Sequence, residues 1–95
     1  MKLMMKYRLQ YSSVYKKQYK KMAKRGLDMK KLDDMEEMLK NGIELPSKYR
    51  DHALKGDWKG YRECHIAPDW LLIYRKDDDV LVLVMQRTGT HSDLF

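Results

Sequence analysis

Three histidines and one aspartate are the side chains of this sequence best suited to moving protons. The chain has only three histidines, His52, His65 and His91, and Asp69 closely follows His65 in the stretch CHIAPDWLLIYRK, residues 64–76. An imidazole titrates at ~6.5, so it can take up or release a proton near neutral pH. None of the three is expected on a helix. Each falls in or beside the expected strands, at a loop or strand end, where functional side chains are often displayed.

Cleavage of RNA is the reaction that fits this set. RNA can be cut without a metal by its own 2′-hydroxyl, provided that a base removes the hydroxyl proton and an acid protonates the departing 5′-oxygen. A cation or a hydrogen-bond donor stabilises the phosphorane that forms in between. An aromatic ring can stack on a splayed base, and Trp70 and Phe95 are candidates for that contact. Taken singly, each histidine is more simply interpreted as an ordinary surface residue.

Metal and thiol chemistry fit the sequence less well. The spacing of the His, Asp and Cys residues matches no compact zinc pattern, so we expect no metal site and no cofactor. Cys64 is the only cysteine, which excludes an internal disulfide and fits a reducing cytoplasm. Strand alternation sends Cys64 toward the core, while His65 faces the other side together with Tyr61 and Glu63. A buried thiol would not be the exposed thiolate that nucleophilic catalysis requires.

Basic residues gather in the first part of the chain. The net charge is +6, and residues 1–27 carry nine Lys or Arg and no acid. Like charges four apart destabilise a helix, so a helix kept only for stability would include glutamates. A solvated basic helix and a polyanion-binding surface both fit the composition, and the missing acids favour a polyanion, above all nucleic acid. The residues on the expected basic face are Lys16, Lys17, Lys20, Lys21, Lys24 and Arg25.

Two helices and a sheet must position these groups. A strand at residues 7–11 leads to a helix capped by Ser12 or Ser13 and ended by Gly26. Asp28 caps a second helix, which stops at residues 41–42, and the two helices are expected to form an antiparallel hairpin. The apolar stripe of the first helix comprises Val14, Tyr15, Tyr19, Met22 and Ala23. The apolar stripe of the second comprises Met29, Leu32, Met35, Met38 and Leu39.

The pattern of the second half of the chain predicts a sheet. Residues 49–59 are expected to be a loop or an irregular edge, followed by strands at 61–66, 70–76 and 80–87 and a tail of turns. The last two strands are apolar on successive residues, which indicates central strands. The predicted fold is α+β: a short N-terminal strand and an antiparallel helical hairpin packed on a twisted, mainly antiparallel sheet.

The size of the chain limits where a site can lie. Ninety-five residues predict one domain over residues 1–95, with too little volume for a large internal cavity, so the site must lie on an open face. No apolar run approaches the ~20 residues of a membrane helix, and the start of the chain has no signal-peptide core. We therefore expect a cytoplasmic protein that does not contact the membrane.

The second half of the sequence resembles the YafQ branch of the RelE/ParE toxin superfamily. The resemblance covers residues 45–95 and is carried by LPSKYRDHALKGDWKGYRECHIAPDWLLIYR and by RTGTHSDLF. The first half matches only in layout, a strand followed by a basic helical hairpin. Membership would imply the RelE-like microbial RNase fold. It would also imply a small bacterial endoribonuclease, the toxin of a type II toxin–antitoxin pair, that cuts translated mRNA in the ribosomal A site, often at adenine-rich codons.

The resemblance also suggests roles for individual residues. His52 would be the general base and His91 the general acid, His65 and Asp69 would orient the substrate or support the transition state, and Arg87 would offset phosphate charge. Trp70 and Phe95 would contact the substrate, and the basic helix would grip ribosomal RNA. The implied partners are a cognate antitoxin, the ribosome and its mRNA, with operator DNA reached only through the antitoxin complex.

Two other functions fit parts of the sequence. A non-catalytic toxin of the same fold, like the ParE branch that poisons gyrase, would not require three histidines and Asp69. A plain RNA- or DNA-binding protein would explain the basic helix, but no helix-turn-helix or RNP pattern is present.

Overall fold

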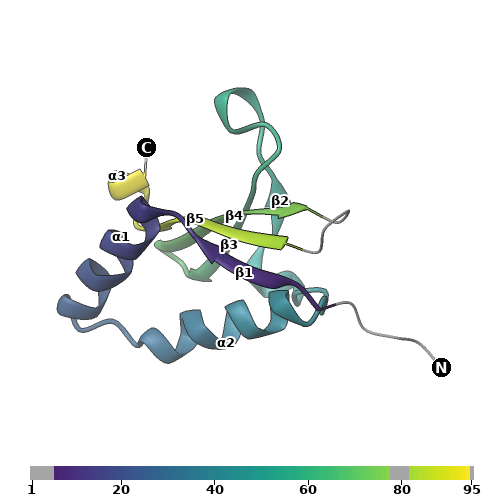
Figure 1. Ribbon diagram of the computed structural model, residues 1–95. Helices are drawn as coiled ribbons and strands as arrows, with labels where there is room; N and C mark the ends of the chain where they lie inside the picture. The colour runs from purple at the N-terminus through teal and green to yellow at the C-terminus, as the bar shows by residue number, and fades with distance from the viewer. Residues whose placement is uncertain (1–5, 78–81, 95) are drawn as a thin grey trace.

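The computed structural model describes residues 6–77 and 82–94, which form a twisted five-stranded sheet with two long helices on one face (Figure 1). The strands lie in the order β1-β5-β4-β3-β2; β1 pairs parallel with β5, and the other neighbours are antiparallel. This arrangement confirms the predicted α+β fold with a mainly antiparallel sheet. The elements are β1 Arg8–Tyr11, α1 Ser13–Lys24, α2 Met29–Lys40, η1 Ser47–Tyr49, β2 His52–Ala53, η2 Gly56–Trp58, β3 Arg62–Ala67, β4 Trp70–Asp77, β5 Val82–Gly89 and α3 His91–Leu94.

The ends of the two helices follow from their capping residues. The Ser12 hydroxyl accepts a hydrogen bond from the Tyr15 amide at 2.9 Å, and the Asp28 carboxylate accepts one from the Lys30 amide at 3.2 Å. Gly26 adopts φ +84°, the left-handed conformation that lets the chain leave α1. These three predictions are confirmed. Ala23 is exposed, contrary to the predicted stripe, because it lies one position around the helix from the buried Met22.

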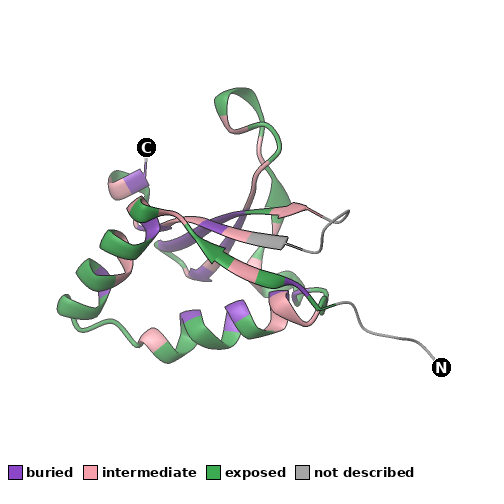
Figure 2. Cartoon of the chain, in the orientation of Figure 1, coloured by how far each residue is buried: buried purple, intermediate pink, exposed green. Residues whose placement is uncertain are grey.

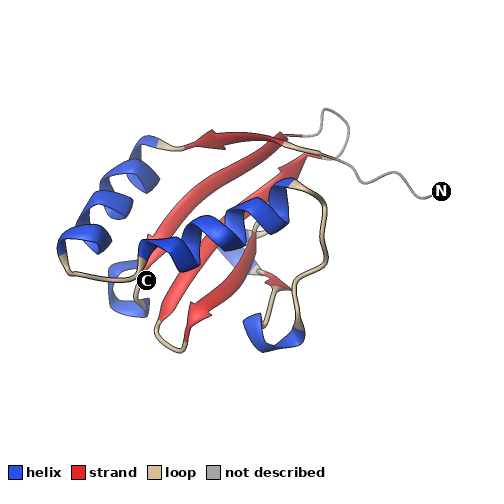
Figure 3. Cartoon of the chain, turned by 90° about the horizontal axis from the view of Figure 1, so that it is seen from below, coloured by secondary structure: helices blue, strands red, loops and turns tan. Residues whose placement is uncertain are grey.

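Both helices pack on the same face of the sheet but diverge as a wide V (Figure 3). Across the V, the Tyr15 hydroxyl donates a hydrogen bond to the buried Glu36, and the Tyr19 hydroxyl donates one to Asp33 at 2.9 Å. Apolar side chains of the sheet pack against the two helices and form the core with them. Residues 70–74 of β4 are all buried, as expected for a central strand (Figure 2). Alternate side chains belong to the two apolar clusters on opposite faces of the sheet.

The C-terminal tail differs from the prediction. Instead of turns it forms the short helix α3, and His91 is its first residue, so the expectation that no histidine lies on a helix is wrong. The Thr90 hydroxyl accepts from the Asp93 amide at 3.3 Å while the Asp93 carboxylate accepts from the Thr90 amide at 3.0 Å. This reciprocal pair is a capping box, which starts a helix where the composition alone indicates turns. Phe95 lies outside the described residues, and among those described no helix is long and apolar enough to cross a membrane.

The buried carboxyl of Glu36 makes the stability of the fold depend on pH. Burial raises the pKa of the Glu36 carboxyl to about 7. The hydrogen bond from Tyr15 lowers this pKa, but its effect is smaller than that of burial. The folded protein therefore holds this proton more tightly than the unfolded chain, whose glutamate titrates at ~4.3. Its stabilising contribution is complete at low pH and is lost as the pH rises through about 7. The total loss is about 2–4 kcal/mol.

We predict that Glu36→Gln removes this loss. The difference in unfolding free energy between variant and wild type, measured by urea titration, should shift in favour of the variant between about pH 4.5 and 7 and then stay constant. Glu37→Gln, on the exposed side of the same helix, is the matched control. A difference that does not change with pH would show that Glu36 is not held protonated.

Candidate active site

The sheet face opposite the helices carries the polar groups. Figure 1 shows the β2–β3 loop and α3 rising on this side, and Leu71, Ile73 and Leu94 form a small apolar cluster there. On β3, alternation places Cys64 in the helix-side core and its neighbour His65 on the open face, as predicted. Burial raises the pKa of the Cys64 thiol, so Cys64 is not a thiolate nucleophile at neutral pH.

The three histidines form a row across this face. The ring of His65 lies 6.5 Å from that of His52 and 6.2 Å from that of His91, measured between centroids. Strand pairing explains the row. His52 on β2 is opposite Glu63 on β3, and His65 is opposite Leu71, which is in turn opposite Gly89, just before His91. The sheet thus brings together histidines that are far apart in the sequence.

Glu63 lies beneath two of these histidines. Its Oε1 atom is 3.5 Å from His65 Nε2 and 3.8 Å from His52 Nε2, and the side chain is only 8% exposed. A buried carboxylate is costly unless nearby positive charge compensates it, and an imidazole at these distances supplies such charge when it is protonated. The sequence analysis placed Glu63 on the same face as His65 but gave it no role. The sequence signal for Glu63 is its position two residues before His65 on a strand, which puts both side chains on the same face.

His52 is held in one orientation by its loop. Its Nδ1 atom lies 2.7 Å from the Arg50 carbonyl oxygen, which can only accept, so Nδ1 carries the hydrogen. In the neutral ring, Nε2 is then the atom that can take up a proton. The next residue back, Asp51, accepts from the Tyr74 hydroxyl at 2.6 Å and pairs with Arg62 at 3.2 Å, which ties the loop to β3 and β4.

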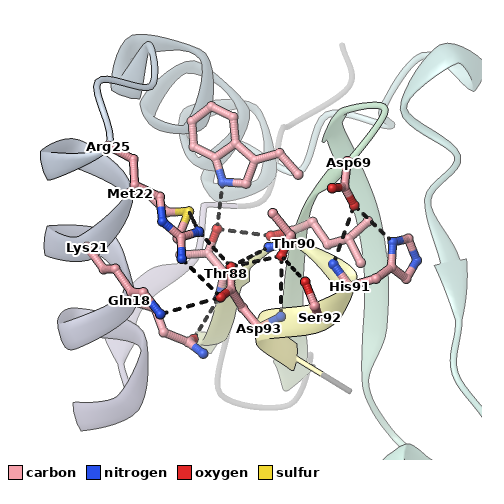
Figure 4. Close-up of polar contacts among 12 residues, drawn as sticks. Gln18, Lys21, Met22, Arg25, Asp69, Thr88, Thr90, His91, Ser92 and Asp93 are labelled. Atoms are coloured by element: carbon pink, nitrogen blue, oxygen red, sulfur yellow. Dashed lines mark hydrogen bonds and ion pairs between the residues drawn. The ribbon is translucent and has the colours of Figure 1, made fainter.

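Asp69 and His91 meet at the other end of the row. Asp69 Oδ1 lies 3.4 Å from His91 Nδ1, and both side chains are exposed to solvent (Figure 4). Asp69 comes from the turn between β3 and β4, and His91 from the start of α3. The carboxylate can hold the ring through Nδ1 and leave Nε2 for a substrate.

Arg87 and Trp58 border the row. The guanidinium carbon of Arg87, on β5, lies 5.2 Å from the centre of the Trp58 ring, which in turn packs edge-on against Tyr61 at 5.4 Å. The Arg87 Nε atom is buried and has no hydrogen-bond partner within the described part of the chain. The sequence analysis did not identify Trp58, and no local pattern distinguishes it from an ordinary loop tryptophan.

Trp70 is not part of the site. Its residue is 4% exposed and lies in the core on the helix side, in phase with Leu72 and Tyr74. The indole Nε1 donates to the Thr88 hydroxyl at 3.1 Å, and that hydroxyl donates to the Leu71 carbonyl at 2.9 Å. The expectation that Trp70 stacks on a base is therefore wrong, because its position on β4 points it into the core.

The basic face of α1 divides into two groups. Lys16, Lys17, Lys20 and Lys24 are exposed. Lys21 and Arg25 are also exposed, but they pair with Asp93 of α3 at 3.4 and 2.9 Å. In residues 6–77 and 82–94, no group of three or more His, Cys, Asp or Glu is arranged to hold a metal ion.

Comparison with known proteins gives one consistent family. The family model described as "Bacterial toxin of type II toxin-antitoxin system, YafQ" matches residues 7–95. The mRNA interferase toxin YafQ of Escherichia coli K12 is 45% identical over 93 residues, covering 97% of this chain and 99% of that protein.

Solved structures agree with the sequence comparison. The crystal structure of the E. coli DinJ-YafQ toxin-antitoxin complex contains a chain with 45% identity and a TM-score of 0.87, covering 95% of this chain and 98% of that one. A metal-bound toxin from Helicobacter pylori is 38% identical with a TM-score of 0.88, covering 94% of this chain and 99% of that one.

The burial of Trp70 leads to a prediction about stability. Trp70→Phe removes the hydrogen bond to Thr88 and leaves a gap in the core, so the free energy of unfolding should fall by about 1–3 kcal/mol. RNA cleavage by the folded fraction should be little changed. Trp58→Phe, on the open face, is the matched control and should be less destabilising. A Trp70→Phe variant of normal stability that cleaves RNA poorly would restore Trp70 to the site.

Proposed function

The chain belongs to the YafQ family of type II toxin–antitoxin toxins, and we propose that it is a ribosome-dependent endoribonuclease that cuts translated mRNA in the A site. The row of three histidines, with Glu63 beneath two of them and Asp69 beside the third, is the observation that supports this most strongly. The curated relatives are named mRNA interferases, whereas poisoning of gyrase would require none of these side chains.

The first half of the proposed reaction takes place at His52. Its Nε2 atom removes the proton from the RNA 2′-hydroxyl, and the oxygen attacks the adjacent phosphorus. In the neutral ring, the hydrogen bond from Nδ1 to the Arg50 carbonyl leaves the lone pair on Nε2, the atom that takes up the proton. Once Nε2 carries the proton, it faces Glu63 at 3.8 Å, so the carboxylate offsets the new positive charge.

The second half takes place at His91. The protonated ring donates its Nε2 hydrogen to the departing 5′-oxygen, while Asp69 holds Nδ1 from the other side. The products are a 2′,3′-cyclic phosphate and a 5′-hydroxyl. His52 then releases its proton to solvent or to the product, and His91 takes up a new proton from solvent.

His65 and Arg87 serve the phosphate between the two steps. His65 lies between the base and the acid, beside Glu63, and Arg87 adds positive charge from β5, on the far side of β4. Both favour the phosphorane, which carries more negative charge than the starting diester. Trp58 is the described tryptophan on this face that can contact a base, in the role first assigned to Trp70.

The partners follow from the family. The E. coli relative has been crystallised with the antitoxin DinJ, and we propose that this chain likewise pairs with a cognate antitoxin, reaching operator DNA only in that complex. Lys16, Lys17, Lys20 and Lys24 would contact ribosomal RNA phosphates, which contributes affinity without sequence information. Such a toxin acts in the cytoplasm, where translated mRNA is found.

We predict that mRNA cut by this protein in a translation extract carries a 2′,3′-cyclic phosphate or 3′-phosphate on one fragment and a 5′-hydroxyl on the other. EDTA-treated protein should give the same ends at the same rate, because histidines supply both proton transfers. End-group analysis of the fragments is the measurement. A 5′-phosphate, or activity that returns only on adding a metal ion, would contradict the mechanism.

Variants at the two ends of the histidine row test the roles of His52 and His91 in the same extract. His52→Ala and His91→Ala should each cut about 10²–10⁴-fold more slowly while melting at the wild-type temperature. Wild-type cleavage by both variants would remove the histidines from the reaction.

A further inference from the structure

The helix that carries His91 is too short to be stable by itself. It has four residues, and an isolated helix in water needs about 12–15. Its position must therefore come from contacts with the rest of the molecule. Leu94 provides one of these, buried against Leu71 and Ile73 on the open face. Asp69, which lies beside the amide and ring of His91, provides a second, and several others converge on Asp93 (Figure 4).

Asp93 joins the cap of α3 to the end of α1. Its Oδ2 atom accepts from the Thr90 amide at 3.0 Å, from the Thr90 hydroxyl at 2.9 Å and from Arg25 Nη1 at 2.9 Å. Its Oδ1 atom lies 3.3 Å from Arg25 Nη2 and 3.4 Å from Lys21 Nζ. One carboxylate thus holds both nitrogens of a guanidinium that is 68 residues away in the sequence.

Three further observations indicate that this contact is fixed. The Asp93 side chain is only 14% exposed, although it lies at the surface between two helices. Gly89 lies so close that a Cβ atom there would be 2.9 Å from Asp93 Cβ, so any larger residue would displace Asp93. The hydrogen bond from Arg25, followed by those from Thr90, also holds the pKa of Asp93 well below its usual range, so the carboxylate is charged at neutral pH.

We propose that Asp93 is a positioning residue for His91, and that Lys21 and Arg25 act with it to hold α3 over the histidine row rather than to bind RNA phosphates. Few contacts link α1 to His91. Arg25 binds the Asp93 carboxylate, this carboxylate accepts hydrogen bonds from Thr90, and His91 follows Thr90 in the sequence. The inference rests on the proposed function of His91 and adds a role for α1 in catalysis. It separates the basic residues of α1 into a structural pair and a set available to a polyanion.

The first test compares rate with affinity. At saturating ribosomes, Arg25→Gln and Asp93→Ala should lower the cleavage rate about 10–10²-fold, the loss expected when a reacting group is displaced by about 1 Å. The concentration of ribosomes giving half the maximal rate should stay near the wild-type value. The triple variant Lys17→Gln, Lys20→Gln, Lys24→Gln should do the opposite, raising that concentration and flattening its salt dependence.

The second test needs no activity. In the free protein, Asp93→Ala should change the NMR resonances of the His91 ring and lower the amide-exchange protection of α3, with those of His52 and His65 unchanged. Asp93→Glu should restore them, because glutamate is the usual partner in a capping box. Lys30→Gln, which breaks the exposed Lys30–Asp34 pair at 2.8 Å on α2, is the control for loss of one basic residue and should match wild type.

The outcomes separate this inference from the proposed function. If the protein cleaves no RNA but His91 and α3 respond to Asp93→Ala, the proposed function fails and the positioning holds. If His91 and α3 are unchanged in both Asp93→Ala and Arg25→Gln, the positioning is wrong whatever the protein cleaves. Should Asp93→Ala fail to fold, Arg25→Gln decides alone, since it leaves the capping box intact.

Discussion

Both long helices pack on one face of the sheet, and the rest of the molecule is arranged around the face they leave open. Within residues 6–77 and 82–94 there is no third long helix to cover that face. Only short elements do so: α3, the turn before β4 and the loop that carries Trp58. Short elements expose their side chains, so the open face is where His52, His65 and His91 can meet a large substrate such as RNA.

Keeping polar groups on this face requires that their charges be balanced. Glu63 is nearly buried, and an uncompensated carboxylate there would destabilise the fold by several kcal/mol. The imidazoles of His52 and His65 lie beside this carboxylate, so each ring can offset its charge when protonated and is in turn held by it. At the other end of the row, Asp69 is exposed, so its effect on His91 is screened by solvent and depends more on geometry than on charge. The row is therefore largely buried at His65 and more open at His91.

Local patterns in the sequence predicted much of this arrangement. The caps at Ser12 and Asp28, the turn at Gly26 and the opposite facing of Cys64 and His65 each depend on a few neighbouring residues, and each is found in the structure. Trp70 was misassigned because its place in a motif says nothing of which sheet face it takes. The helix α3 was missed although Thr90 and Asp93 have the spacing of a capping box. The pairing of Asp93 with Arg25 was beyond local patterns, because it depends on the tertiary fold.

The roles of His52 as base and His91 as acid can be separated with an mRNA that has a 5′-sulfur in place of the 5′-oxygen at the cleaved bond. A thiolate leaves without protonation, so this substrate needs a base but no acid. We predict that His91→Ala cuts the sulfur-containing mRNA at nearly the wild-type rate, while His52→Ala stays slow. Rescue of His52→Ala with no rescue of His91→Ala would reverse the two roles, and rescue of neither would show that His91 does not act as the general acid.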